Sequence, residues 1–215
     1  MSLLVTFEGP DGSGKTTQIR LLAERLQALS YDVLITREPG GTPIGDQIRA
    51  VLHDVKNIEM ACETEFLLYS ASRAQLVRQM IVPHLARGGI VLCDRFADSS
   101  LAYQGYGREL DLEAIRLITR FATGGLTPHL TVYLDLPVEV GIERKQVAYA
   151  AQTGEWNRLD QQSVDFHRRV RRGYLEMAQA EPDRWLVIDA TQSVDDTQAI
   201  IRMRLEALLS HSTRS

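Results

Sequence analysis

The segment from Gly9 to Thr17 constrains this chain more than any other. Between Gly9 and Thr16 it fits the spacing G-x-x-x-x-G-K-[ST]. An apolar run at 3–7 precedes it, and a stretch with apolar residues at helical spacing follows it. A strand, a Gly-rich turn and a helix in this order are the context in which the spacing indicates a phosphate-binding loop. The loop comprises Gly9, Pro10, Asp11, Gly12, Ser13, Gly14, Lys15, Thr16 and Thr17.

The chemistry of this loop suits the phosphates of a nucleotide. Glycines let successive backbone N–H groups point into one concavity, and the N-terminus of the following helix favours anions. Lys15 adds a positive charge near the outer phosphates, and the Thr16 hydroxyl can ligate Mg²⁺. The alternative is a chance match in an ordinary Gly-rich turn, which the flanking strand and helix disfavour.

Short β-rich runs alternate with longer helical stretches along the chain. We predict strands at 3–7, 33–36, 90–93, 130–135 and 185–188. Helices are predicted at 15–30, about 44–53, 63–87, 112–122, 138–151, 161–179 and 194–209. Apolar strands separated by helices are typical of a parallel sheet that is covered on both faces. We therefore expect one α/β domain over residues 1–215, of the P-loop NTPase type, with a five-stranded parallel sheet, helices on both faces and a short lid at about 142–160.

Charge and cysteine content narrow the classes of partner. With a formal net charge of -4, the protein as a whole does not attract polyanions, so we expect no nucleic acid polymer as a partner. A small anionic ligand held by local arginines is compatible with this net charge. The two cysteines, Cys62 and Cys93, form no disulfide framework or metal-ligand spacing, which fits a reducing cytosol. No signal peptide and no apolar run of membrane-spanning length are visible, so we expect a cytoplasmic protein without a membrane partner.

Polar residues stand directly after the strands, where ligands bind in open parallel sheets. Asp94 and Arg95 follow the third strand; the acid suits Mg²⁺ and the arginine suits phosphoryl oxygens, with a strand-end salt bridge as the alternative. Arg37 follows the second strand and opens a turn at 37–42 that is stiffened by Pro39. That turn either faces a ligand or is an exposed loop with incidental charges.

Two helical segments carry groups that suit a planar base. Tyr69 and Arg73 are four residues apart in the helix predicted at 63–87, so they share a face, where a ring can stack and a guanidinium can bond to carbonyl oxygens. The alternative is a core tyrosine beside a surface arginine. The segment at 99–104 offers hydroxyl and amide groups, although its residues alone indicate only a polar helix.

The segment from Arg144 to Arg158 has the composition of a lid. It contains the small residues at 148–151, Gly154 as a candidate hinge, and the basic residues Arg144, Lys145 and Arg158. Arginines on a mobile flap can close over phosphates and neutralise charge that grows in a transition state. The alternative is a solvated charged surface.

Taken together, these stretches resemble the thymidylate (dTMP) kinases, a family of P-loop nucleoside monophosphate kinases. The matching segments are 7–17, 37–42, 94–96 with 99–104, and 157–160, in the family's order and spread over nearly the whole chain. Many P-loop proteins share the first segment, but its combination with the Arg-Glu-Pro-Gly-Gly turn and the Tyr103–Gln104 helix is specific. The resemblance implies ATP and dTMP as substrates, Mg²⁺ as cofactor, dTDP and ADP as products in dTTP biosynthesis, and a homodimer.

The resemblance also implies roles for single residues. Lys15 and Thr16 would serve the ATP phosphates and the metal. Asp11 would contact the 3′-hydroxyl of dTMP, and Arg37 and Arg95 would grip its phosphate.

On the base side, the resemblance implies that Tyr69 lies against thymine, where the family often has Phe, and that Arg73 bonds to a thymine carbonyl. Ser100 and Gln104 would read the base. Tyr103 would crowd the 2′ position of the sugar and so disfavour ribonucleotides.

One departure from the family concerns the charge stabiliser. Some members carry an arginine inside the loop at the position of Gly12, and others place basic residues in the lid. This chain resembles the second kind, which makes Arg144 and Arg158 the candidates, although the segment 146–156 between them contains neither Arg nor Lys. Two other functions stay open: a kinase for another nucleoside or nucleotide on the same fold, and a nucleotide-dependent switch, against which the absence of an Asn-Lys-x-Asp guanine signature speaks.

Overall fold

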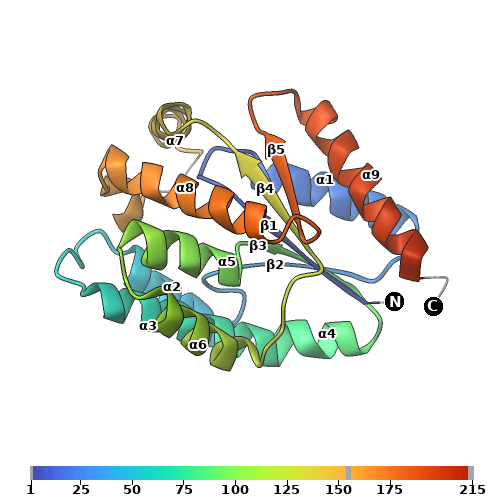
Figure 1. The fold of residues 1–215 in the computed structure, drawn as a ribbon, viewed down its shortest axis with the longest axis horizontal. Coiled ribbons are helices and arrows are strands. Elements are labelled where there is room, and N and C mark those ends of the chain that lie inside the picture. Colours follow the sequence, from blue (N-terminus) through green and yellow to red (C-terminus); the bar gives the residue numbers. More distant parts are fainter. Residues whose placement is uncertain (1, 154–155, 213–215) are drawn as a thin grey trace.

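A five-stranded parallel sheet forms the centre of the protein (Figure 1), as predicted. The computed structural model describes residues 2–153 and 156–212. The strand order is β2-β3-β1-β4-β5, so the first strand lies in the middle of the sheet. The strands are β1 (Leu3–Glu8), β2 (Val33–Arg37), β3 (Ile90–Asp94), β4 (Leu130–Asp135) and β5 (Trp185–Asp189).

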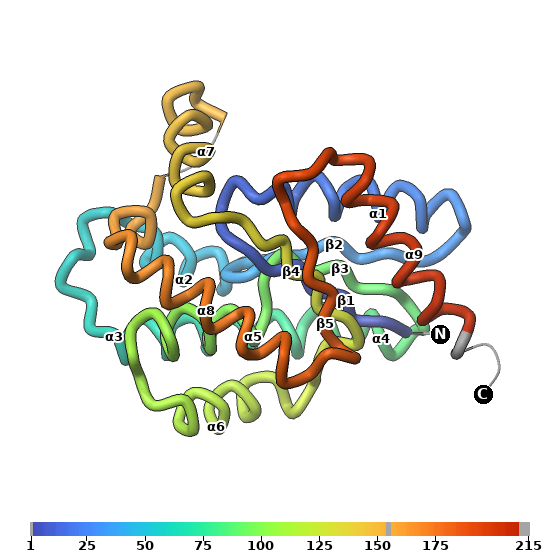
Figure 2. Tube along the Cα trace, turned by 45° about the horizontal axis from the view of Figure 1, so that its top comes forward, coloured from blue at the N-terminus to red at the C-terminus, as the bar shows by residue number. Residues whose placement is uncertain are grey.

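Helices cover both faces of the sheet. On one face lie α1 (Lys15–Ala28) and α9 (Val194–Ser212), and the other face is covered mainly by α3, α4, α5 and α8 (Figures 1 and 2). The remaining bounds are α2 (Pro43–His53), α3 (Cys62–Leu76), α4 (Val82–Ala86), α5 (Ala97–Ser100), α6 (Leu112–Thr123), α7 (Val138–Ala150) and α8 (Val164–Ala180).

The long helix predicted at 63–87 is interrupted. A π-helical turn, η1 (Val77–Ile81), joins α3 to α4. Pro83 stands in the first turn of α4, and because its nitrogen carries no hydrogen it cannot continue an α-helical hydrogen-bond ladder. A second π-helical segment, η2 (Leu101–Gly107), extends α5 and carries part of the site described below.

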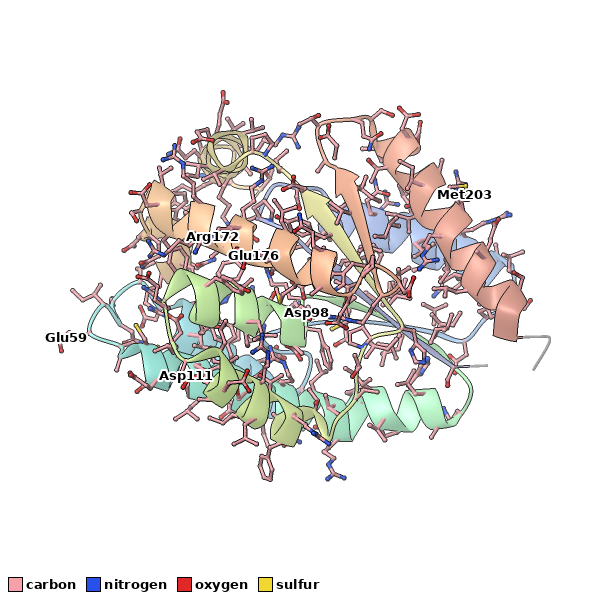
Figure 3. All side chains as sticks on the ribbon, viewed as in Figure 1. Glu59, Asp98, Asp111, Arg172, Glu176 and Met203 are labelled. Carbon is pink, nitrogen blue, oxygen red and sulfur yellow. The ribbon has the colours of Figure 1, made fainter. Side chains whose placement is uncertain are left out.

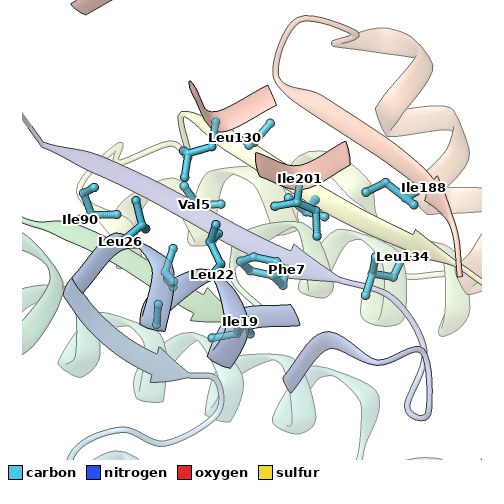
Figure 4. Packing of buried hydrophobic residues seen from close by; sticks show 14 of the residues in the cluster. Val5, Phe7, Ile19, Leu22, Leu26, Ile90, Leu130, Leu134, Ile188 and Ile201 are labelled. Atoms are coloured by element: carbon cyan, nitrogen blue, oxygen red, sulfur yellow. The ribbon is translucent and has the colours of Figure 1, made fainter. Parts of the chain in front are cut away.

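Alternation along β1 directs its side chains to two different environments. Val5 and Phe7 pack with Leu22 of α1 and Ile201 of α9 in the main core (Figure 4). Burial of one such side chain contributes about 1.5–3 kcal/mol. By the same alternation Leu4 and Glu8 face the opposite layer, which places a carboxylate beneath α5 and α8.

A buried ion pair ties this second layer to the sheet. Asp98 of α5, labelled inside the molecule in Figure 3, accepts hydrogen bonds from Arg184 at 2.7 and 3.0 Å, just before β5 begins. The Thr131 hydroxyl of β4 donates to the same carboxylate at 3.0 Å. These contacts fix the start of α5, on which several of the predicted site residues depend.

The predicted lid segment leaves the body of the protein. Helix α7 projects beyond the sheet (Figure 2), and the chain returns through a short 3₁₀ helix, η3 (Arg158–Gln161). A capping box between Asn157 and Asp160 fixes the start of η3. Gly154, the predicted hinge, lies outside the described residues. Within the described ranges, no helix is long and apolar enough to cross a membrane.

Candidate active site

A cavity of about 880 Å³ opens at the C-terminal ends of the strands, where a ligand was predicted. Its walls come from the phosphate-binding loop, the ends of β2 and β3, helix α3, the α5–η2 segment, α7 and α8. The cavity therefore joins segments that are far apart in the sequence. It is large enough for more than one small ligand group.

The phosphate-binding loop needs glycine for two separate reasons. Gly9 has φ 138°, and a Cβ there would approach the Leu134 carbonyl oxygen to 2.6 Å. Gly12 has φ 80°, and a Cβ there would lie 3.0 Å from the Cβ of Arg144 on α7. Because α7 packs directly on Gly12, a larger side chain at that position would push against α7.

Lys15 and Thr16 stand at the mouth of this loop, at the N-terminus of α1. The Lys15 ammonium is buried and donates to the carbonyl oxygens of Gly9 and Pro10 at 3.0 and 2.9 Å. Burial and the nearby Arg95 lower the pKa of Lys15. The Thr16 hydroxyl lies 3.3 Å from an oxygen of Asp94, so a hydroxyl and a carboxylate meet at the edge of the loop.

Three cations surround Asp11 at the wall of the cavity. Arg95 donates to one of its oxygens at 2.9 Å and Lys145 to the other at 2.6 Å, while Lys15 lies 3.7 Å away. Burial alone would raise the pKa of Asp11, but these three cations outweigh it and hold the pKa well below its usual value. Lys145 also reaches Asp160 at 3.3 Å, so one lysine links the loop to both ends of the lid segment.

Arg95 adopts a backbone conformation that is unusual for a residue with a side chain. Its φ is 68°, in the left-handed region. The buried carboxylate of Glu8 accepts the next backbone N–H, that of Phe96, at 2.9 Å, and it also accepts hydrogen bonds from Ser99 and Tyr174. Glu8 thus holds the turn that aims Arg95 at Asp11.

Burial raises the pKa of Glu8 to about 7, against the pull of Arg95. Sequence reasoning did not select this residue. The available signal was a carboxylate inside an apolar strand run, on the opposite side from Phe7.

Arg73 is an interior residue. Its side chain is 1% exposed, and its Nε donates to Glu38 at 2.7 Å. Its terminal nitrogens donate to the Ser100 hydroxyl at 2.9 Å and to the Phe96 carbonyl at 3.1 Å. The alternative of a surface arginine beside a core tyrosine is therefore wrong: Arg73 is held from all sides and lines the cavity together with Tyr69.

The η2 segment contributes Tyr103 and Gln104 to the same wall. The guanidinium of Arg95 lies over the Tyr103 ring, 5.0 Å from its centroid. The Gln104 amide nitrogen donates to Glu65 of α3 at 2.9 Å. Burial raises the pKa of Tyr69, with a further contribution from Glu65, so the Tyr69 phenol stays neutral.

The remaining predicted arginines occupy three different settings. Arg37 lines the cavity, is 58% exposed and lies 3.7 Å from Asp46. Arg144 packs on the loop, 3.4 Å from the Gly12 carbonyl and 3.3 Å from that of Ala190. Arg158 is buried in an ion pair with Glu65 and does not line the cavity. The lid cation that does line the cavity is Lys145.

The predicted Mg²⁺ ligands, Thr16 and Asp94, are adjacent. Among the described residues, no group of three or more His, Cys, Asp or Glu side chains is arranged to hold a metal ion. A hydroxyl and a single carboxylate suit Mg²⁺, which usually keeps several waters and completes its shell with phosphates of a substrate.

Comparison with known proteins gives one consistent result. The family model "Thymidylate kinase" matches residues 7–201. The thymidylate kinase of Roseiflexus sp. (strain RS-1) is 52% identical over 221 residues, with 100% of this chain and 98% of the relative covered. That of Deinococcus radiodurans is 55% identical over 199 residues, covering 93% of this chain and 94% of the relative. The crystal structure of thymidylate kinase from Ehrlichia chaffeensis matches with a TM-score of 0.76 at 32% identity, covering 95% of this chain and 98% of that one.

Proposed function

The chain belongs to the thymidylate kinase family, a family of enzymes that phosphorylate dTMP, and from this premise we propose how its residues divide the reaction. The γ-phosphoryl of ATP passes directly to a phosphate oxygen of dTMP, giving dTDP and ADP. The two nucleotides lie end to end in the cavity, with the ATP phosphates at the loop and thymidylate along α3 and η2. The observation that carries this division is the junction of the loop with two further polar clusters in one cavity.

On the ATP side, the backbone N–H groups of the loop and the Lys15 ammonium bind the phosphates. Lys15 now donates to two loop carbonyls, and we propose that phosphate oxygens replace them as acceptors. Thr16 and Asp94 are the residues that would hold Mg²⁺, and their adjacent oxygens fit that ion. When bound, Mg²⁺ neutralises charge on the phosphates.

On the thymidylate side, Arg95 and Arg37 bind the phosphate. Arg95 is already oriented by its contact with Asp11, whereas Arg37 is exposed and would leave its 3.7 Å contact with Asp46 to turn toward a ligand. Asp11 accepts a hydrogen bond from the sugar 3′-hydroxyl. Tyr103, held beneath Arg95, fills the space that a 2′-hydroxyl would need.

The base lies between Tyr69 and the buried Arg73. Tyr69 stacks on thymine, and Arg73 donates to a thymine carbonyl. Ser100 and Gln104 complete the edge that reads the base. Ser100 also accepts from Arg73 at 2.9 Å, so the reading groups are coupled to one another.

Lys15, Arg95 and cations of the lid neutralise the negative charge on the phosphoryl group as it passes between the nucleotides. Arg144 contacts the loop, and Lys145 lines the cavity beside Asp11, so we propose that these two act on the phosphates. Arg158 has a structural role instead of acting on the phosphates. Its buried pair with Glu65 makes it an anchor for the end of the lid.

We also propose that the enzyme is a cytoplasmic homodimer. Both cysteines, Cys62 and Cys93, are free, which fits a reducing compartment. Helices α3 and α6 lie side by side (Figure 1) and expose Leu67, Leu117 and Phe121, the last two by 71% and 88%. A second copy of the chain, covering these side chains, is the occupant we propose for this surface.

A coupled assay of ADP release tests the substrate assignment. With ATP and Mg²⁺ present, dTMP is expected to give much faster ADP release than dUMP, dCMP, dGMP or thymidine. Equal release without any nucleotide acceptor would contradict the proposal and indicate a regulatory ATPase. Faster release with another acceptor would assign the site to that nucleotide.

A further inference from the structure

A buried glutamate behind the base-reading wall controls which atom of Gln104 faces the ligand. Glu65 of α3 is fully buried, so solvent water does not compete for hydrogen bonds to its carboxylate oxygens. One oxygen accepts from the Gln104 amide at 2.9 Å and from Arg108 Nε at 3.3 Å. The other accepts from Arg108 Nη2 at 2.9 Å and from Arg158. Every neighbour of this carboxylate in these contacts is a donor.

The charge state of Glu65 follows from these neighbours. Burial would raise its pKa, but hydrogen bonds from Arg108 and Gln104, together with the charge of Arg158, outweigh burial and lower it. The side chain is therefore an ionised carboxylate, which can only accept hydrogen bonds.

An acceptor-only neighbour decides the orientation of the Gln104 amide. Its NH₂ group must face Glu65, because the reverse orientation would set two oxygens against each other. The Gln104 carbonyl oxygen receives no hydrogen bond from any described residue, and the side chain lines the cavity. Gln104 therefore presents an acceptor to the ligand.

Glu38 holds Arg73 in place from behind the same wall. It is buried and binds the Arg73 guanidinium at 2.7 Å, and this pair keeps a donor at the cavity wall. Arg73 and Gln104 thus offer the same cavity one donor and one acceptor. Thymine presents the complementary pair, a carbonyl oxygen and a ring N–H, whereas cytosine presents an amino group and a bare ring nitrogen, which reverses both.

We propose that Glu65 is a positioning residue that sets base selectivity by fixing Gln104 as an acceptor. The inference rests on the proposed placement of thymine at this wall. A pyrimidine with a ring N–H next to a carbonyl can bind at this wall. A pyrimidine with a bare ring nitrogen would set that nitrogen against the Gln104 carbonyl oxygen, so two acceptors would face each other. Glu65 itself touches no substrate.

The test replaces Glu65 by its neutral isostere. In Glu65→Gln, the oxygen of the new amide takes the position that accepts from Arg158 and Arg108 Nη2, because guanidiniums cannot accept hydrogen bonds, and the longer 3.3 Å contact from Arg108 Nε is lost. The new NH₂ then faces Gln104, which must turn its own oxygen inward and present NH₂ to the cavity. We expect the ratio of kcat/KM for dTMP to that for dCMP to fall about tenfold or more, mainly through a higher KM for dTMP.

Two further variants separate positioning from general damage. Arg108→Met removes donors from the same carboxylate but leaves the bond between Glu65 and Gln104, so the ratio should stay within about twofold of wild type although the melting temperature falls. The double variant Glu65→Gln with Gln104→Glu restores an acceptor-only group at the cavity, and its ratio should return toward wild type. If Glu65→Gln does not fold, the inference is tested by comparing the kcat/KM ratio of the double variant with that of Arg108→Met.

The outcomes are distinct. A wild-type ratio in Glu65→Gln, an equal loss in Arg108→Met, or a double variant that discriminates no better than Glu65→Gln would each overturn the inference. If the wild-type enzyme itself failed to prefer dTMP over dCMP, the proposed placement of the base would fail instead.

Discussion

The buried carboxylate of Glu8 should make the stability of the protein depend on pH between 4.5 and about 7. Its pKa is raised from 4.5 to about 7 because folding removes it from water beneath α5 and α8. In the unfolded chain the carboxylate ionises near 4.5, so between that pH and 7 the unfolded state is charged while the folded state keeps the proton. The stability that Glu8 contributes is thus complete below pH 4.5 and is lost as the pH rises through 7.

The size of this effect follows from the shift. The rise in the pKa of Glu8 from 4.5 to about 7 corresponds to about 3 kcal/mol, most of which falls between pH 5 and pH 8. Glu8→Gln has no proton to lose there. We therefore expect the free energy of unfolding of wild type, minus that of Glu8→Gln, to decrease by roughly 2 to 3 kcal/mol between pH 5 and pH 8.

Urea unfolding of both proteins at pH 5, 6, 7 and 8 measures this difference. Glu24→Gln, which removes an exposed carboxylate of α1, controls for the loss of one negative charge. If wild type and Glu8→Gln keep a constant difference over the whole range, Glu8 does not titrate in this window, and its assignment as a protonated buried group is wrong.

Three other predictions concern the site and the α3–α6 surface. Lys15→Ala and Arg95→Ala should lower kcat by about two orders of magnitude or more while the far-UV spectrum is kept, and near-normal turnover would refute their assignment. Lys145→Ala should lower kcat more than Arg158→Met does. Arg158→Met should instead lower the free energy of unfolding by up to about 3 kcal/mol, because Arg108 alone then neutralises Glu65. The reverse ranking of the two variants, in kinetics and in urea unfolding, would show that the lid cations are misassigned. Phe121→Glu should shift the protein from dimer to monomer in sedimentation velocity, and an unchanged mass would exclude the α3–α6 surface.

The sheet could be predicted closely because its signals are local. Apolar runs bounded by turn residues fixed the five strands, which differ from the predicted ranges by at most one residue at the C-terminal end. The Gly-rich loop likewise carries its geometry in its own residues, and Gly9 and Gly12 do adopt positive φ. The interruption of the helix at 63–87 was missed, although Pro83 was the available signal.

The site was harder to predict, because burial of a charged residue depends on partners from distant segments. Arg73 can be buried because Glu38, 35 positions earlier in the sequence, forms an ion pair with it. The sequence predicts Arg158 to be a lid cation, yet Glu65, 93 positions earlier, fixes it in the interior. Glu65 gave no signal of its own, since a glutamate in a polar helix is ordinarily exposed.

The central claim is that two nucleotides meet end to end in one cavity, with fixed cations around the phosphate that passes between them. A crystal structure with dTMP and a non-hydrolysable ATP analogue tests it most directly. We predict thymine between Tyr69 and Arg73, and its phosphate beside Arg95, directed toward Lys15. Thymidylate bound away from Tyr69 and Arg73, or with its phosphate directed away from Lys15, would contradict the account.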